Sequence, residues 1–486
     1  MLIKGFLKTI IMFLPISVLA GCSVNPATGE RQFTALMPAS QEASIGQGEH
    51  PKILATYGGA AANQKLESYI RSIGNKLIPY TERQDVTYSF HLLDTPMVNA
   101  FAVPGGYIYI TRGLVALADN EAELAGVMAH EIGHITARHS AERYSQSVLA
   151  GLGTMVLAAA VDNPNATKMA GLGSELYLKS YSRSQEHQAD ELGVRYLTRA
   201  GYDPYAMSSF LLKLQKHTEL QNLINDTQSG GDVNYFATHP QTEERIAQAS
   251  AHAAASHNGS PKIINRDAYL QQINGMIFGD SPRQGYVRGN IFIHPEMGFL
   301  FEAPQGYDIV NQPTQILVHS KNGPVSIFDT AKNTNKISPQ NYIAQEWLTK
   351  ENPQNLESIT IGGKPAATAT LSGVLKGQKA TVRVMAISWD ANTFFRFQMA
   401  YPENISAASL DDLKRMTYSL RPINAAEKQK YKPYKVSLQR AYSADSVHSL
   451  SQSQPLDKYN LEWFLLLNGL VKNEPLEVGK TYKVIK

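Results

Sequence analysis

His130-Glu131-Ile132-Gly133-His134 is the stretch of sequence that decides the fold, because an HExxH motif on a helix is a metal-binding pattern. A helix turns about 100° per residue, so His130 and His134 lie on one face and can bind the same ion. Glu131, beside them, is placed to act as the general base that activates water. Asn120 is a candidate N-cap, and Glu123 would complete a capping box. The stretch therefore predicts one Zn²⁺ per chain, bound by a capped helix.

A third ligand must come from elsewhere in the chain, because catalytic zinc sites usually take three protein ligands. Glu186 and Asp190 are four residues apart in a second predicted helix, over about 174–199, and share one face of it. We expect Glu186 to be the third ligand and Asp190 to accept the free N–H of a ligand histidine. On spacing alone, His187, Asp190 and Glu191 remain alternative ligands. Further helices are expected at 203–217 and 240–257.

Two other histidines differ in their placement. His139 follows His134 by five residues, which turns it about 140° away on a continuous helix, so we expect it to be exposed. His239 lies in Thr238-His239-Pro240, just before the start of a predicted helix. From there it would donate to a tetrahedral oxyanion, or cap the zinc when substrate is absent. A surface loop histidine without a role is the alternative.

A predicted β-hairpin precedes the metal-binding helix and is a candidate for binding substrate. Residues 101–103 and 107–111 are strand-like and flank Pro104-Gly105-Gly106. An extended peptide would add to the free edge of the first strand, at Phe101, while Asn99 holds the peptide backbone. An ordinary hairpin that binds nothing is the alternative.

The N-terminus has the features of an exported, lipid-anchored protein. A short basic stretch precedes an apolar run over 10–20 that is too short to span a bilayer. The run ends in Leu19-Ala20-Gly21-Cys22, which resembles a bacterial lipobox, and Cys22 is the only cysteine of the chain. We therefore expect residues 1–21 to be a signal peptide and Cys22 to carry the lipid. Ser23 indicates sorting to the outer membrane, so the expected location is its periplasmic face.

Charge and composition limit the other classes of function. The formal net charge of +3 over 486 residues gives no basis for binding nucleic acid or a strongly charged substrate. The hydrophobic content of 43% is ordinary for a soluble protein of several domains. Residues 148–161 form an apolar segment that is short for a membrane span. We interpret it as a buried core helix or, alternatively, as a mobile lid over the cleft or a contact for an apolar partner.

These motifs together resemble the HtpX- and BepA-like zinc metalloproteases. The resemblance covers about residues 23–255 and implies a compact, mostly helical gluzincin fold with a small sheet. It implies His130, His134 and Glu186 as zinc ligands, Glu131 as the base and Asp190 as the partner of a ligand histidine. It rests on the HExxH motif, Ser182-Arg183-x-x-Glu186-x-x-Ala189-Asp190, Thr238-His239-Pro240, Glu244-Arg245-Ile246, Asn99–Gly106 and Asn25–Gly29.

Family members without transmembrane helices act in the periplasm on misfolded or stalled outer-membrane proteins, often with chaperone-like behaviour. The resemblance therefore implies a zinc-dependent endopeptidase, anchored to the outer membrane through Cys22, that hydrolyses misfolded or stalled envelope proteins. BepA-like members carry helical repeats after the protease, but the C-terminal half of this chain shows no repeat of about 34 residues. One alternative is a chaperone-like or peptidoglycan-binding periplasmic lipoprotein with latent proteolytic activity. A peptidoglycan amidase is another.

The C-terminal half is expected to be α+β, with a mostly antiparallel sheet. Residues 295–421 resemble a PsbP-like domain, and the tail from 437 resembles a LysM-type module, which implies contact with peptidoglycan. A helix-and-hairpin packing module that binds no glycan is the alternative for the tail. The expected fold is therefore multidomain: a mainly helical gluzincin-type metalloprotease domain with a small sheet, an α+β domain and a small LysM-like module. The expected order is a signal peptide over 1–21, a lipidated tether over 22–50, the protease domain over 51–257, a linker over 258–290, the α+β domain over 291–421, a basic linker over 422–436 and the module over 437–486.

Overall fold

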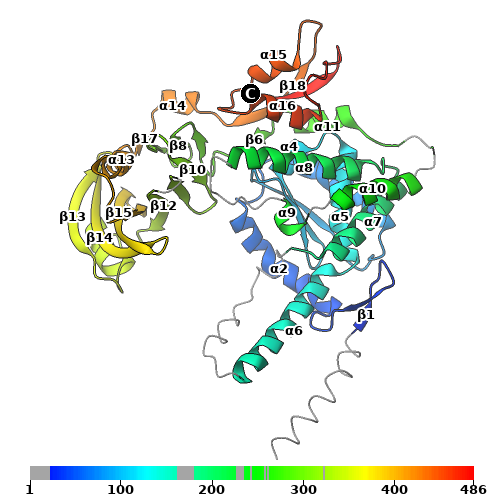
Figure 1. The fold of residues 1–486 in the computed structure, drawn as a ribbon, viewed down its shortest axis with the longest axis horizontal. Helices are drawn as coiled ribbons and strands as arrows, with labels where there is room; N and C mark the ends of the chain where they lie inside the picture. The colour runs from blue at the N-terminus through cyan, green and yellow to red at the C-terminus, as the bar shows by residue number, and fades with distance from the viewer. Residues whose placement is uncertain are drawn as a thin grey trace, which may run out of the picture.

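The computed structural model describes residues 22–160, 180–225, 235–240, 243–256, 259, 262–320 and 323–486 (Figure 1). The expected signal peptide, residues 1–21, lies outside them. A helical part contains the HExxH helix, a β-rich part lies to one side of it, and a small C-terminal module packs near α4 and α11. Over the described ranges, no helix is both long enough and apolar enough to cross a bilayer.

The helical part is built around a three-stranded sheet of order β3-β5-β4. Strand β3 (Ser89–Leu93) runs parallel to β5 (Tyr107–Thr111), while β4 (Ala100–Val103) forms the expected antiparallel hairpin with β5. No further strand pairs with β4 among the described residues, so β4 is an edge of the sheet. Strand β5 continues directly into α4 (Arg112–Leu117).

The two faces of this sheet are covered by different helices, because side chains alternate along a strand. Ala100 and Ala102 of β4 belong to a core with α3 (Gln64–Leu77) and the HExxH helix α5 (Glu121–Thr136). Phe101 and its alternate neighbours pack on the opposite face against α2 (Ala39–Thr56). The strand edge beside the metal-binding helix is therefore lined by small residues.

Helix α5 begins where the sequence predicts. The Asn120 side chain accepts the N–H of Glu123 at 2.9 Å, but the Glu123 carboxylate accepts the N–H of Asp119, at 2.7 Å, instead of closing the box on Asn120. Every residue of α5 is buried, under α3, α7 (Arg183–Arg199) and α8 (Ala206–Asn225). A helix that is buried on all sides is part of the core, and its polar side chains need partners there.

The second site helix begins later than the predicted 174. Helix α7 starts at Arg183 because Ser182 caps it and forms a reciprocal capping box with Gln185. Residues 180–182 before it are not helical. The further predicted helices appear as α8 and α10 (Glu243–Ser256), with the short α9 (Tyr235–Thr238) between them. Helix α6 (His139–Ala160) includes most of the apolar segment 148–161. The side chains of 151–160 are outside the described part, so the interpretations of this segment as a core helix, a lid or a contact for a partner stay predictions.

The expectation of a loosely structured tether over 22–50 is wrong. Strands β1 (Cys22–Val24) and β2 (Arg31–Phe33) form a hairpin, and α2 follows it directly. Glu42 of α2 is buried and is bound by two arginines of the protease part, Arg83 and Arg138. These charge-assisted contacts hold the segment against the fold.

Both expected linkers are structured as well. Residues 262–290 contain α11 (Arg266–Ile273), β6 (Ile277–Phe278) and β7 (Tyr286–Arg288), and α11 contributes three buried side chains to the protease core. Residues 422–436 contain α14 (Ala425–Lys430), which a capping box between Asn424 and Glu427 stabilises. Turn residues and lysines suggested linkers, but buried apolar side chains and helix caps decide the structure here.

The β-rich part has the expected α+β, antiparallel character. A seven-stranded sheet of order β10-β11-β12-β16-β15-β14-β13 packs near a four-stranded sheet of order β17-β9-β8-β7. Short helices α12 (Pro339–Tyr342), η4 (Ile343–Trp347) and α13 (Ala407–Tyr418) accompany them. The strands not yet placed are β8 (Ile291–His294), β9 (Phe299–Glu302), β10 (Asp308–Asn311), β11 (Ile316–His319), β12 (Val325–Lys332), β13 (Gln354–Ile361), β14 (Lys364–Leu375), β15 (Gln378–Asp390), β16 (Thr393–Pro402) and β17 (Arg421–Pro422).

The C-terminal module consists of β18 (Tyr434–Arg440), α15 (Val447–Gln452), α16 (Asn460–Asn468) and β19 (Thr481–Ile485). Strand β18 pairs with both β19 and β6, so the module shares a sheet with the segment that leaves the protease part.

A buried lysine of the module also binds the protease part. The Lys483 Nζ donates to the carbonyls of residues 116–118 at distances between 2.6 and 3.3 Å, and pairs with Asp119 at 3.2 Å. Four contacts to the end of α4 dock the module directly before the metal-binding helix.

Candidate metal centre

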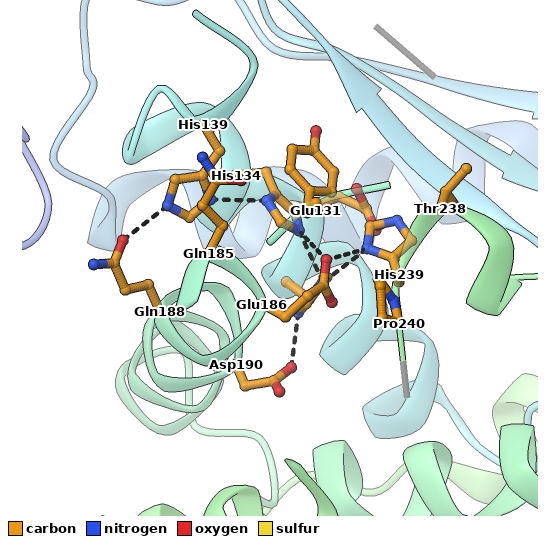
Figure 2. Close-up of polar contacts among 12 residues, drawn as sticks. Glu131, His134, His139, Gln185, Glu186, Gln188, Asp190, Thr238, His239 and Pro240 are labelled. Carbon is orange, nitrogen blue, oxygen red and sulfur yellow. Dashed lines mark hydrogen bonds and ion pairs between the residues drawn. The ribbon is translucent and has the colours of Figure 1, made fainter. Parts of the chain in front are cut away.

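Four buried side chains from three segments converge on one point. His130 and His134 come from α5, Glu186 from α7, and His239 from the turn after α9. One ligand atom from each lies within 4.8 Å of all the others. Figure 2 shows His134, Glu186 and His239 pointing toward one another, with Glu131 beside them. The alternative ligands lie elsewhere, because Glu191 is exposed and His187 faces Glu244 at 4.0 Å.

Each histidine that α5 contributes to the cluster has a partner on its far nitrogen. Asp190 Oδ1 lies 2.9 Å from His130 Nδ1. Because a carboxylate only accepts, this contact places a proton on Nδ1 and leaves the Nε2 lone pair free. The Asp190 carboxylate is fixed in turn, and the charge of Arg245 lowers its pKa although burial acts to raise it.

His134 is oriented by a longer chain of contacts that sequence reasoning missed. Its Nδ1 lies 2.8 Å from His139 Nδ1, and His139 Nε2 lies 2.9 Å from Gln188 Oε1 (Figure 2). The Gln188 Nε2 donates to Glu30, so its oxygen faces His139 and accepts the Nε2 proton. His139 then accepts the Nδ1 proton of His134, and the His134 Nε2 lone pair points into the cluster.

The expectation that His139 is exposed is wrong. Its side chain is fully buried. Arg138 has a φ of +57°, so α5 ends at Thr136 and α6 starts at His139 in a new direction. The angle counted along a continuous helix therefore does not apply. Arg138 is held in this conformation by Glu42 of α2, whose Oε1 is 2.7 Å from its Nε.

The residues present fit a divalent cation. The Nε2 atoms of His130 and His134 face each other at 3.0 Å, and both lone pairs are left free by the contacts described above. Glu186 Oε2 and Oε1 lie 3.5 Å from His130 Nε2 and His134 Nε2 respectively. Two imidazole nitrogens and a carboxylate that converge in this way are ligand types that Zn²⁺ takes in proteins.

Arg245 of α10 is a site residue that sequence reasoning did not assign. Its Nε and Nη2 bind both oxygens of Asp190 at 2.7 and 2.8 Å, and its Nη1 lies 2.7 Å from Glu186 Oε2. It is 1% exposed. The sequence contained only an indirect indication of this role. Two buried carboxylates on α7 require a buried cation nearby, and Arg245 follows His239 by six residues.

Glu131 is fully buried beside the cluster, which raises the pKa of its carboxyl group. His239 Nε2 lies 3.5 Å from its Oε1, and the nearby backbone of Ala102 in β4 acts to lower its pKa, although neither carboxylate oxygen has a hydrogen-bond partner among the described residues. The carboxylate is therefore placed between the cluster and the edge strand.

The two residues expected to bind substrate, Asn99 and Phe101, lie in different surroundings. The Asn99 amide is buried, and neither its oxygen nor its nitrogen has a partner among the described residues. The expectation for Phe101 is wrong, because its ring stacks on Tyr109 at 5.0 Å and contacts Tyr57 at 5.1 Å in the core beside α2. Alternation along β4 points it away from the metal-binding helix.

Two tyrosines pack the histidines of the cluster. Tyr181 stacks on His134 with ring centroids 3.7 Å apart, and Tyr235 stacks on His239 at 4.5 Å. The Tyr181 N–H donates to the carbonyl of Thr238 at 3.1 Å. These contacts fix the turn that carries His239 against the site.

An HExxH helix, a glutamate from a second helix and a buried carboxylate beside them define the class of metallopeptidases. Residues 64–253 match the model of Peptidase family M48. That range contains every residue of the cluster described above.

Curated relatives match the same part of the chain. The beta-barrel assembly-enhancing protease of Escherichia coli (strain K12) is 34% identical over 216 residues, which cover 42% of this chain and 42% of that protein. The protein of the same name from Yersinia pestis is 31% identical over 193 residues, 38% of each chain. The mitochondrial metalloendopeptidase OMA1 of Schizosaccharomyces pombe is 25% identical over 223 residues, 46% of this chain and 63% of that one. The matched region thus spans about two fifths of the length of the first relatives.

Among solved structures, the solution structure of a cyanobacterial PsbP from Synechocystis covers 29% of this chain and 98% of its own. Its TM-score is 0.23 at 9% identity, which carries no argument about the β-rich part.

Proposed function

We propose that this protein is a zinc-dependent endopeptidase, held at the periplasmic face of the outer membrane, that hydrolyses misfolded or stalled envelope proteins. The observation that carries the proposal is the convergence of His130, His134, Glu186 and His239 within 4.8 Å, with Glu131 beside them. A pure binding protein has no use for a buried glutamate at that position. A His/His/Glu set suits zinc among the divalent ions.

The residues of the chain divide the chemistry among them. His130, His134 and Glu186 would hold Zn²⁺, which when bound polarises the scissile carbonyl and lowers the pKa of the attacking water. Glu131 takes the proton of that water on its carboxylate and delivers it to the leaving amine. The raised pKa of the Glu131 carboxyl group brings it closer to neutrality, where a group can both accept and donate a proton.

The free edge of β4 is the proposed place for the substrate. Residues 98, 100 and 102 turn their backbone groups away from β5, because the carbonyl of Asn99 accepts the N–H of Thr111 and backbone groups alternate along a strand. The outward carbonyl of Val98 accepts the N–H of Tyr235. Ala100, between them, is available to pair with an extended peptide. The unpartnered amide of Asn99 is the proposed second contact to the peptide backbone.

The location is proposed from the N-terminal sequence. A lipid on Cys22 would anchor the chain, and the hairpin that begins at Cys22 leads directly into α2. Contact of the C-terminal module with peptidoglycan is part of the same proposal. Names of the relatives that refer to β-barrel assembly support envelope proteins as substrates.

We infer that His239 caps the metal at rest and leaves it when substrate binds. Its Nδ1 lies 3.0 Å from Glu186 Oε1 and 3.3 Å from His130 Nε2, inside the ligand set. We expect His239→Ala to retain one zinc per chain and to raise cleavage at least about threefold, because the uncapped fraction limits activity. Peptidase assays with metal analysis measure both. A fall of about 10²-fold or more would instead assign His239 as a donor to the oxyanion.

Removing the metal tests the proposed function. We expect the purified chain to cleave a reduced, unfolded polypeptide, to lose this activity when a chelator strips its zinc, and to regain it with one equivalent of Zn²⁺. The readout is cleavage followed by gel and mass spectrometry.

Two other results would support the competing functions. A zinc-loaded chain that binds the polypeptide without cleaving it would indicate the chaperone-like lipoprotein with latent activity. Release of peptide stems from purified sacculi, without cleavage of polypeptide, would indicate a peptidoglycan amidase.

A further inference from the structure

A cavity of about 910 Å³ lies where the protease part, the β-rich part and the C-terminal module meet. The loop before β4 and helix α4 form one wall, α8 and α16 another, and β6 and β10 close the remainder. It is separate from the metal cluster, since none of the four ligand residues lines it. Its volume falls in the range of sites that enclose a ligand.

The lining is mostly apolar, and its charged side chains are Arg112 and Asp280. Met97, Phe278, Trp463 and Leu467 are among the large apolar side chains. Burial lowers the pKa of His217 to about 4, so this lining ring is neutral at pH 7. Several amides supply the polar atoms. Such a lining favours an uncharged occupant with apolar side chains.

One wall of the cavity is the outer edge of a strand. The N–H of Gln312 donates to the carbonyl of Gln315, so alternate residues of β10 pair with β11. By this alternation Ile309 and Asn311, both in the lining, turn their backbone N–H and C=O groups outward. No strand pairs with this edge within the described ranges. Free backbone groups of this kind accept an added strand.

Two side chains beside this edge also lack partners for polar atoms. Arg112 lines the cavity and is 3% exposed, and its Nη2 has no hydrogen-bond partner in the described part of the chain. The Asn311 Oδ1 is likewise buried and unpartnered there. One donor and one acceptor match the two hydrogen-bonding groups of a peptide unit. Buried polar atoms without partners are uncommon, and each needs an explanation such as a bound water or ligand.

We propose that this cavity binds an extended, uncharged and apolar stretch of the polypeptide substrate, which adds as a strand to the outer edge of β10. The proposal rests on the proposed peptidase function, because the bound chain is the one that the metal centre hydrolyses. The cavity also adjoins the site: Val98 lines it, and its carbonyl accepts the N–H of Tyr235 at 3.1 Å. Tyr235 stacks on His239, so Val98 connects the lining of the cavity to the segment that carries the cap.

The test uses the full chain carrying Glu131→Gln, so that a bound peptide is not cleaved. The probe is a fluorescent ten-residue peptide of alternating valine and serine, compared with the same peptide N-methylated at alternate residues. Ile309→Pro removes the outward N–H of β10, and Ile309→Ala is the matched control that keeps it. We expect the unmodified peptide to bind, and Ile309→Pro to weaken its binding about tenfold, the effect of one or two lost backbone hydrogen bonds. We expect N-methylation of the peptide to weaken its binding to the same extent, and Ile309→Ala to weaken binding less.

A second readout uses the chain with Glu131 intact. Ile309→Pro should raise KM for a long unfolded polypeptide without changing kcat, and should leave cleavage of a short peptide unchanged. Equal binding of both peptides, or displacement of the peptide by oleate, would assign the cavity to acyl chains and overturn the proposal. If Ile309→Pro does not fold, the two peptides still decide the question on Ile309→Ala.

The two proposals can fail separately. If peptide binding depends on the β10 edge but the chain cleaves nothing, the peptidase function is overturned and the cavity is supported as a polypeptide site. Cleavage of polypeptide without edge-dependent binding overturns the cavity alone.

Discussion

Glu131→Gln should reduce kcat about 10²- to 10⁴-fold, the usual contribution of a general base, while the chain keeps its zinc. The amide is nearly the same size as the carboxylate, so the packing of the buried site is retained. It accepts no proton at neutral pH, and the water therefore loses its activation. Metal content stays the same because Glu131 is outside the set of His130, His134, Glu186 and His239. Steady-state peptidase kinetics and metal analysis of the same sample check both parts.

Glu191→Gln is the matched control for that change. Glu191 lies on α7 like the proposed ligand Glu186, but it is exposed. On spacing alone it was an alternative ligand. We expect unchanged kcat and unchanged zinc. Loss of zinc in Glu191→Gln, or full activity in Glu131→Gln, would contradict the assignment of these two glutamates.

Arg245→Met should destabilise the protein by about 3–5 kcal/mol, as expected when one partner of a buried ion pair is removed. Arg245 is the common partner of Asp190 and Glu186, and all three side chains are buried. Without the guanidinium, both carboxylates face an uncompensated burial cost. Because Asp190 positions His130, zinc affinity should also fall about 10- to 100-fold. Urea unfolding and competition with a zinc chelator measure the two effects.

Arg71→Met is the control on the surface. Arg71 pairs with Glu67 on α3 at 3.5 Å, and its side chain is 56% exposed. An exposed pair contributes less than about 1 kcal/mol, so this variant should be close to the unchanged protein. Equal destabilisation by the two variants would show that Arg245 has no special role in the site. Arg245→Lys, which keeps the charge but not the paired donors, should fall between them.

The local parts of the site were predictable from the sequence. The HExxH spacing and the Asn120 cap are properties of one helix, and the structure has that helix at Glu121–Thr136. The hairpin of β4 and β5 is equally local. The pair Glu186 and Asp190 was found because four residues make one helical turn. These features need no knowledge of the rest of the fold.

The misassigned residues depended on contacts that the local pattern does not contain. His139 is buried because Arg138, held by Glu42 of a distant helix, takes a left-handed conformation and redirects the chain. Phe101 faces the core because alternation on β4 is set by which face α5 covers. Arg245 joins the site through packing of α10 on α7.

The expected linkers and tether failed for a similar reason. Polar and turn-forming residues over 258–290 concealed three buried side chains of α11, Tyr269, Leu270 and Ile273. The cavity was the feature that sequence analysis could least predict, because its lining combines residues far apart in the chain, such as Met97, Ile309 and Trp463. No local pattern relates residues so far apart, and only the assembled fold places them together.

The most direct test of the account is an anomalous difference map at the zinc absorption edge, from crystals of the purified chain. The account predicts one peak per chain, bonded to the Nε2 atoms of His130 and His134 and to the carboxylate of Glu186. Zinc–nitrogen distances near 2.0–2.1 Å, roughly the usual value, would establish the ligand set. A peak on other residues, or a chain that cleaves polypeptide with no peak at this cluster, would contradict it.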